Sequence, residues 1–308
     1  VKLKDGSFQA LDMARVRTII NDACNGLDSV NSERVYNDTL RNLFDGVPAS
    51  DVSPTVVLSA RGLIDSEPQY SQVAARLLLD ELRTETLTFI DDGSPTATYI
   101  EMADRYPQYF HQYVKKAAEL ELLDTELLKF DFKKLGDALK PERDHLFTYL
   151  GLQTLYDRYF IHHEECRFEL PQAFFMRVSM GLAINEVHRE ERAIEFYNLL
   201  SSFDFMSSTP TLFNSGTLRP QLSSCYLTTI PDDLDGIFSA IKDDAMLSKF
   251  AGGLGNDWTR VRAMDSRIKG TNGKSQGVVP FLKVANDTAV AVNQGGKRKG
   301  AMCAYLET

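Results

Sequence analysis

The sequence predicts an α+β chain with a mostly helical first two thirds, followed by the opening of an α/β unit. Apolar residues recur at helical spacing through residues 1–206. After residue 207, short β-like runs alternate with helical segments between Gly, Asn and Asp. The chain has 308 residues, of which 43% are hydrophobic and 25% charged, as in a globular protein of two or three domains.

Residues 1–92 are expected to form one domain with a hairpin and four helices. Asp5-Gly6 lies between two short alternating runs, which is typical of a hairpin turn. Asp12 is a typical helix cap, and Ser53-Pro54 indicates the start of the third helix. The fourth helix is the clearest, because one apolar stripe runs along it: Tyr70, Val73, Ala74, Leu77, Leu78 and Leu82.

Residues 93–206 are expected to form a mostly helical connecting domain, and residues 207–308 a third domain. Prolines mark the expected starts of connecting segments: Pro107, Pro141 and Pro171. In the third domain a helical pattern covers residues 234–250, and β-like runs cover 223–229, 277–284 and 301–306. One α/β unit cannot cover both faces of its sheet, so we expect the chain to be part of a longer protein.

Composition argues against several classes of protein. A net charge of −9 at pH 7 disfavours the broad basic face that binds duplex nucleic acid. No run approaches eighteen apolar residues, and the first residues lack the apolar core of a signal peptide. We therefore expect a soluble, cytoplasmic protein with no nucleic-acid or membrane partner.

The cysteines and histidines predict neither a disulfide framework nor a metal site. The cysteines lie far apart and form no C-x-x-C pair: Cys24, Cys166, Cys225 and Cys303. The neighbouring side chains of residues 162–166 (HHEEC) cannot all reach one ion, so a solvated hairpin tip is the preferred interpretation. An individual thiol could still carry chemistry.

A run that resembles a P-loop is rejected. Residues 270–275 (GTNGKS) end like one, but that motif needs glycine at the position of Ile268. It also needs a helix directly afterwards, and residues 277–280 (GVVP) do not look like a helix start.

Uncommon features gather between residues 207 and 300. Cys225 lies on a predicted strand, as either a buried inert thiol or a reactive one. The glycine-dense run 251–256 would let a ligand approach the backbone. The run 294–300 (QGGKRKG) is either an anion-binding loop or a solvated turn. These features favour a phosphate-bearing small ligand, as do the nearby cations Arg260, Arg262, Arg267 and Lys269.

Six motifs occur in order along this region. They are TPTLFNSG at 209–216, QLSSCYL at 221–227, DDLD at 232–235, GGLG at 252–255, RVR at 260–262 and QGGKRKGA at 294–301. They resemble the amino-terminal portion of the large, catalytic subunit of class I ribonucleotide reductase, and residues 1–92 resemble the ATP-cone of that family. The resemblance implies a helical ATP-cone-like and connecting region, followed by the beginning of a ten-stranded α/β barrel that is truncated at Thr308.

The resemblance implies the radical-based, allosterically regulated reduction of ribonucleoside diphosphates to deoxyribonucleotides for DNA synthesis. Cys225 corresponds to the first cysteine of the reducing pair, which stores the oxidation as a disulfide. The other catalytic groups would lie beyond Thr308, so this chain alone would be inactive. The implied partners are a metal-containing, radical-generating small subunit, thioredoxin or glutaredoxin, and a second copy of the chain. No cofactor would be bound directly.

The resemblance also implies roles for individual residues. Three would contact the substrate: Thr209, Ser224 and Gly253. Four would form the allosteric specificity site for a deoxynucleoside triphosphate or ATP: Asp232, Arg262, Ile268 and Lys269. Two would lie in the loop that relays the identity of the effector: Gln294 and Arg298. In the specificity site Asp232 would accept a ribose hydroxyl, whereas Arg262 and Lys269 would meet phosphates.

The ATP-cone pattern is incomplete. Leu3, Ala49 and Thr84 stand where the family has a basic residue, a threonine and a lysine. Lys4 and Arg15 are the cations that remain as candidates for binding ATP. A structural or degenerate cone is therefore our hypothesis.

Two rival interpretations stay open at this point. A non-catalytic nucleotide-binding regulator with an ATP-cone would need a metal-binding or DNA-reading module, which is not visible. A glycyl-radical reductase shares the barrel but would carry its radical glycine near a distant carboxyl terminus. The sequence after Thr308 would separate these classes.

Overall fold

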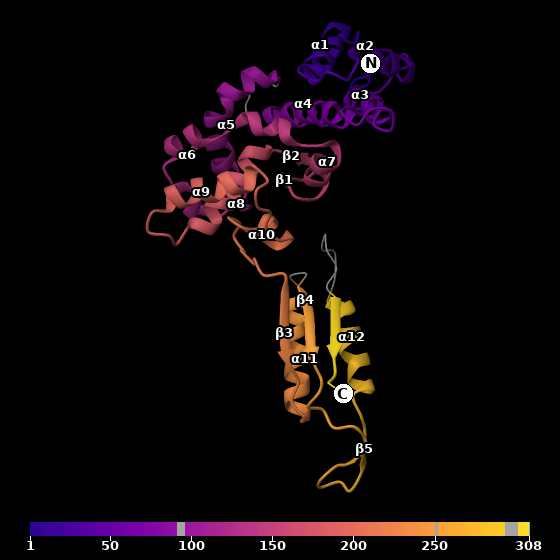
Figure 1. The fold of residues 1–308 in the computed structure, drawn as a ribbon, viewed down its shortest axis with the longest axis vertical. Helices are drawn as coiled ribbons and strands as arrows, with labels where there is room; N and C mark the ends of the chain where they lie inside the picture. Colours follow the sequence, from indigo (N-terminus) through magenta and orange to yellow (C-terminus); the bar gives the residue numbers. More distant parts are fainter. Residues whose placement is uncertain (91–95, 250–251, 293–300, 308) are drawn as a thin grey trace. The chain divides into compact units, whose positions relative to one another are not determined.

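A computed structural model describes residues 1–90, 96–249, 252–292 and 301–307. The chain mixes helices with small sheets and divides into two compact units (Figure 1). The first comprises Val1–Ser207 with Leu212–Pro220, and the second comprises Ser208–Thr211 with Gln221–Thr308.

The first unit begins with the predicted hairpin and four helices. A bridge between Lys2 and Phe8 closes the hairpin around Asp5, whose Oδ1 accepts from the Ser7 amide at 2.9 Å. The helices are α1 (Met13–Cys24), α2 (Ser32–Asn42), α3 (Val52–Arg61), preceded by the 3₁₀ turn η1 (Ala49–Asp51), and α4 (Tyr70–Ile90). The carboxylate of Asp12 accepts from the Arg15 amide, which confirms the predicted cap of α1.

The remainder of this unit is mostly helical, as predicted. It contains α5 (Tyr99–Glu119), η2 (Thr125–Lys129), α6 (Phe132–Ala138), η3 (Pro141–Leu146), α7 (Tyr149–Arg158), α8 (Pro171–Ala183) and α9 (Arg189–Ser201), and α10 (Thr209–Asn214) follows at the junction of the units. The two-residue strands β1 (His162–His163) and β2 (Cys166–Arg167) form an antiparallel hairpin. This confirms the hairpin-tip interpretation of residues 162–166.

Pro107 does not start a segment, contrary to the prediction, because it lies inside α5. An interior proline removes a helical hydrogen bond and costs about 3 kcal/mol. Buried aromatic rings on both sides of it, including Tyr106 and Phe110, hold the helix in the core. The proline ring also packs against α6, since a Cβ on Gly136 would lie 3.0 Å from that of Pro107.

A buried ion pair fixes α8 within this unit. Arg177 and Glu169 are fully buried, and Arg177 Nε donates to Glu169 Oε1 at 2.9 Å. Arg177 Nη1 donates to the carbonyls of Leu212 and Ser215, each at 2.9 Å. Because every charge is hydrogen-bonded, the pair ties α8 to the segment that follows α9.

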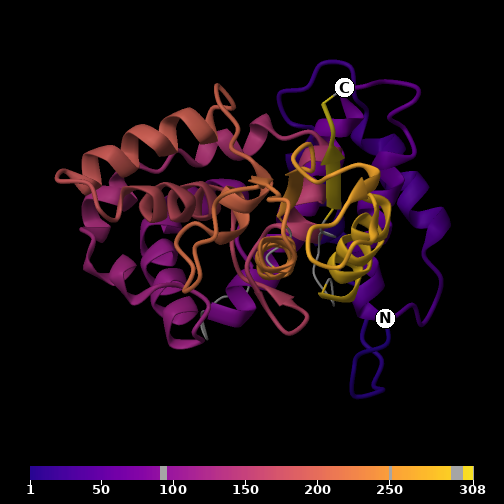
Figure 2. The ribbon, with the colours of Figure 1, turned by 90° about the horizontal axis from the view of Figure 1, so that it is seen from below.

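The second unit contains a parallel sheet with the order β3-β4-β7. Its strands are β3 (Cys225–Thr229), β4 (Gly253–Asp257) and β7 (Ala301–Tyr305), and its helices are α11 (Leu234–Ser248) and α12 (Val279–Val292). The hairpin of β5 (Met264–Arg267) and β6 (Lys274–Gln276) lies between β4 and α12 in sequence. Seen from below, α11 is viewed end-on (Figure 2).

One face of this sheet packs against the helices, and the other is open as far as the described residues show. Leu254 and Asn256 are buried, and Asn256 Nδ2 donates to Asp244 of α11 at 3.1 Å. Alternate residues point the other way, where Leu227 and Tyr305 are 83% and 52% exposed.

Two sequence predictions fail in this unit. Residues 277–284 were expected to form a strand, and 277–280 not to start a helix, yet α12 begins at Val279. Pro280 lies in the first turn, where its missing N–H costs nothing, and Ala285 and Ala289 form the buried stripe.

Within the glycine-dense run, residues 253–256 belong to β4. A Cβ on Gly255 would lie 2.6 Å from Leu227 Cδ2, so a larger residue there would displace the Leu227 side chain. The P-loop is absent, as predicted, because its last residues form β6 rather than a helix.

Candidate functional site

Cys225 begins β3 on the open face of the sheet. Its thiol is free and exposed, so it is not the buried inert cysteine that was one alternative. In the parallel register Cys225 lies opposite Gly253, whose amide donates to the Ser224 carbonyl at 2.7 Å. A Cβ on Gly253 would lie 3.5 Å from the Cys225 sulfur, so glycine leaves the space beside the thiol open.

Two of the three residues expected to bind substrate, Ser224 and Gly253, lie beside this thiol. Ser224 Oγ donates to Cys225 Sγ at 3.6 Å, and Gly253 is the register partner of Cys225. Thr209 is the first residue of α10. Thr211, on the same helix, donates to the carbonyl of Leu222 at 3.3 Å, which ties the start of α10 to the segment that enters β3.

Cys303 lies on the same face but cannot pair with Cys225. It is the register partner of Gly255 on β7, so β4 separates the two cysteines. Two strand spacings amount to roughly 9.5 Å, whereas a disulfide needs Cα atoms within about 7 Å. Tyr305, also on this face, has its pKa raised by a hydrogen bond and by the charge of Cys303.

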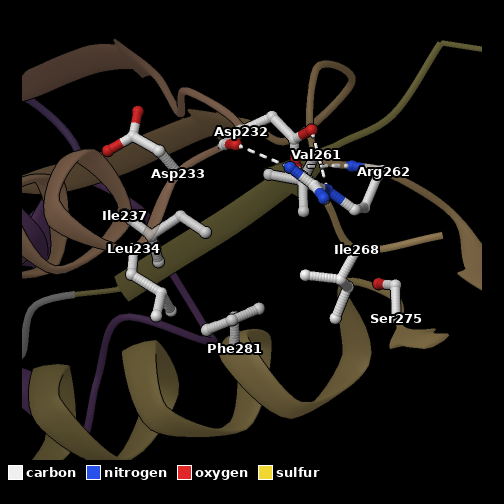
Figure 3. A pocket seen from close by; sticks show the side chains of 9 residues that line it. All are labelled: Asp232, Asp233, Leu234, Ile237, Val261, Arg262, Ile268, Ser275 and Phe281. Atoms are coloured by element: carbon white, nitrogen blue, oxygen red, sulfur yellow. Dashed lines mark hydrogen bonds and ion pairs between the residues drawn. The ribbon is translucent and has the colours of Figure 1, made fainter. Parts of the chain in front are cut away.

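A pocket of about 210 Å³ lies at the other end of the sheet strands, where the loop after β3 meets the β5–β6 hairpin (Figure 3). Three of the four residues expected at the specificity site line it: Asp232, Arg262 and Ile268. Apolar residues from α11 and α12 complete the wall: Leu234, Ile237 and Phe281. The predicted residues therefore converge although thirty positions separate Asp232 from Arg262.

Lys269, the fourth predicted residue, does not line this pocket. Lys269 is exposed in the loop of the β5–β6 hairpin. The Ile268 amide closes this loop by donating to the Gly273 carbonyl at 2.9 Å. Sequence reasoning missed Ser275 and Phe281. Ser275 belongs to the run that resembles a P-loop. That run therefore contains a pocket residue although it is not a P-loop.

Asp232 and Arg262 bind each other rather than facing the pocket separately. Arg262 Nε donates to both carboxylate oxygens of Asp232 at 3.0 Å, and the Arg262 amide donates to Oδ1 at the same distance. These bonds lower the pKa of Asp232, chiefly through the side-chain hydrogen bond from Arg262. Each side chain is 35% exposed, so the pair stays accessible to a ligand.

The remaining predicted residues lie elsewhere. Gln294 and Arg298 fall outside the described residues. Lys4 is exposed in the N-terminal hairpin. Arg15, on α1, forms an ion pair of 3.3 Å with Asp80 of α4.

Family models match two adjoining parts of the chain. The ribonucleotide reductase all-alpha domain matches residues 145–220, and the ribonucleotide reductase barrel domain matches residues 223–308. The parallel sheet with its helices is thus the beginning of that barrel, and it is not closed within the described residues. The chain belongs to the ribonucleotide reductase family, and within it to the large subunits.

Relatives support the same assignment. Ribonucleoside-diphosphate reductase subunit alpha of Chlamydia trachomatis is 49% identical over 306 residues, which are 99% of this chain and 29% of that protein. The subunit alpha of Helicobacter pylori is 38% identical over 307 residues, or 99% of this chain and 37% of that protein. The large subunit of Danio rerio is 35% identical over 310 residues, again 99% and 37%.

The chain thus spans 29% to 37% of the length of these three relatives. In the part of the chain that the structure describes, no helix is both long and apolar enough to cross a membrane.

Proposed function

We propose that this chain is part of a ribonucleoside-diphosphate reductase that converts ribonucleoside diphosphates to deoxyribonucleotides. The observation that supports this most directly is the exposed Cys225 thiol, which lies beside Gly253 on an open sheet face. Two thiols would supply two electrons: the 2′ C–O bond breaks, a C–H bond forms, water leaves, and the thiols become a disulfide. Thioredoxin or glutaredoxin would then reduce that disulfide.

Cys303 cannot be the second thiol, because β4 separates it from Cys225. We propose that the second thiol is supplied by a part of the longer protein outside this chain. The test uses the longer protein with its radical-generating partner. Cys225→Ser should abolish thioredoxin-dependent turnover, whereas the matched variant Cys303→Ser on the same face should keep it. Normal multiple turnover by Cys225→Ser would remove Cys225 from the mechanism.

We further propose that the pocket of Figure 3 binds a deoxynucleoside triphosphate or ATP as an effector. Its apolar wall suits a sugar or base, and the Asp232–Arg262 pair offers both an acceptor and a cation. The exposed Lys269 would reach the phosphates from the hairpin loop. Residues 294–300 would couple this site to the substrate, which is allostery between two distinct sites.

A homodimer is proposed from the outer surface of α11 and α12. Large apolar side chains are exposed along it: Leu234, Phe238, Met246, Val284 and Val290. Several large exposed apolar side chains on neighbouring helices are typical of protein interfaces. Sedimentation of the longer protein should give a dimer, and Phe238→Glu should give a monomer. An unchanged dimer in that variant would place the interface elsewhere.

A further inference from the structure

A second, smaller pocket lies in the first unit, where α1 and α4 meet the start of α5. Three arginines line it: Arg15 from α1, and Arg76 and Arg83 from α4. Tyr99 and His145 close it with rings stacked 3.9 Å apart. These residues are distant in sequence and converge through the packing of the unit.

The arginines of this pocket are incompletely neutralised. Arg15 and Arg83 share one carboxylate, that of Asp80, at 3.3 Å each. Arg76 donates to the neutral carbonyls of Ala23 and Asn25, at 3.0 and 2.8 Å. With Asp22, the lining holds three guanidinium groups against two carboxylates.

Arg83 is the central observation. Its side chain is only 8% exposed, and its Nε–H has no hydrogen-bond partner among the described residues; the same holds for Nε of Arg76. A buried donor without an acceptor is unfavourable. The nearby Asp144 interacts with Arg83 through its charge, but its oxygens accept their hydrogen bonds from Tyr106 and Gln172.

Besides burial, the positive charge of the arginines also lowers the pKa of His145. The pKa of His145 is lowered to about 4, first by burial and then by the charges of Arg76 and Arg83. His145 is therefore neutral at physiological pH and adds no further cation.

We propose that this pocket binds one phosphate-sized oxyanion. Guanidinium groups match the geometry of phosphate oxygens through paired N–H donors. The pocket has a volume of about 30 Å³. A volume this small excludes a nucleoside, so the ligand would be a single small oxyanion. The site is separate from the effector pocket and does not depend on the proposed reaction.

The test is a titration of the whole chain with inorganic phosphate at constant ionic strength, followed by calorimetry. We expect saturable binding of one phosphate. Arg83→Gln and Arg15→Gln should each weaken it about ten-fold, as expected for loss of a charge-assisted contact. Arg17→Gln is the matched control, because Arg17 lies on the same helix but pairs with Glu33 outside the pocket.

One further variant is expected to bind phosphate more tightly, a result that misfolding would not produce. Asp80→Asn removes the carboxylate that competes for Arg15 and Arg83, so it should tighten phosphate binding by about three-fold or more. Because Arg15 is partly exposed, Arg15→Gln is expected to fold. Arg15→Gln and Asp80→Asn therefore test phosphate binding even if Arg83→Gln does not fold. Glycerol 3-phosphate is the second arm: competition indicates that the site accepts a phosphomonoester, and no competition restricts it to the free ion. Absence of saturable phosphate binding, or equal weakening by Arg17→Gln, would overturn the proposal.

Discussion

The guanidinium of Arg262 is bound by the carboxylate of Asp232, with Nε 3.0 Å from both oxygens. The pair joins the segment after β3 to the segment after β4 at the wall of the pocket in Figure 3. An arriving ligand therefore meets a preformed acid–base pair instead of two independent side chains. This geometry holds Arg262 in place before a phosphate or ribose arrives.

Asp232→Asn should weaken effector binding by about ten-fold, because the variant loses the charge that holds Arg262 in place. Stability should change by less than about 1 kcal/mol, since both side chains are partly exposed. Equilibrium binding of a deoxynucleoside triphosphate to the longer protein measures the first effect, and urea unfolding measures the second. Unchanged affinity would show that the pair is structural.

Thiol reactivity should divide the cysteines into two classes. Cys225 and Cys303 are exposed, whereas burial raises the pKa of Cys24 and of Cys166 to about 11. At pH 8 iodoacetamide should label Cys225 and Cys303 first, because only the thiolate reacts. Mass spectrometry of the native chain over time measures the order. Early labelling of Cys24 would contradict the packing of α1 against α4.

Gly181→Ala should destabilise the chain by about 3 kcal/mol or more, because overpacking against backbone cannot relax easily. An added Cβ would lie 2.1 Å from the Gly216 amide nitrogen. Gly151→Ala is the matched control within a helix, since its new Cβ would meet Thr148 Oγ1 at an ordinary 3.6 Å. That control should be neutral or stabilising by up to about 1 kcal/mol. Urea unfolding of both variants decides.

Glu81 should make stability fall as pH rises. Burial, together with the charge of Glu85, raises the pKa of Glu81 from 4.5 to about 7. Between these two values the folded chain binds more protons than the unfolded chain, so its free energy of unfolding decreases with pH. Glu81→Gln should flatten this dependence between pH 4.5 and 7 and stabilise the chain at pH 8 by about 1 kcal/mol, allowing for partial exposure. A pH series of urea unfolding in both proteins tests this; identical slopes would contradict it.

Structural features that depend on residues close together in the chain can be predicted from the sequence. The carboxylate of Asp12 caps α1, and the apolar stripe from Tyr70 to Leu82 is buried in α4, because capping and amphipathic spacing act within a few residues. The motif around Cys225 likewise indicates the family, because its residues are consecutive in the chain.

The conformations of β4 and α12 depend on contacts with residues that are distant in sequence, which local sequence patterns do not reveal. The glycines of β4 lie in a strand because they pair with β3 on one side and with β7 on the other. Val279 opens a helix despite its β-branched neighbours because Ala285 and Ala289 are buried on one stripe.

The sequence by itself determined the amphipathic helices, the cap of α1 and the membership of the family, because each of these depends on residues close together in the chain. Only the tertiary structure decided that Asp232 binds Arg262, that Cys303 is out of reach of Cys225, and that Arg15, Arg76 and Arg83 share one pocket. Such relationships join residues that are far apart in sequence, and strand order and helix packing set their distances.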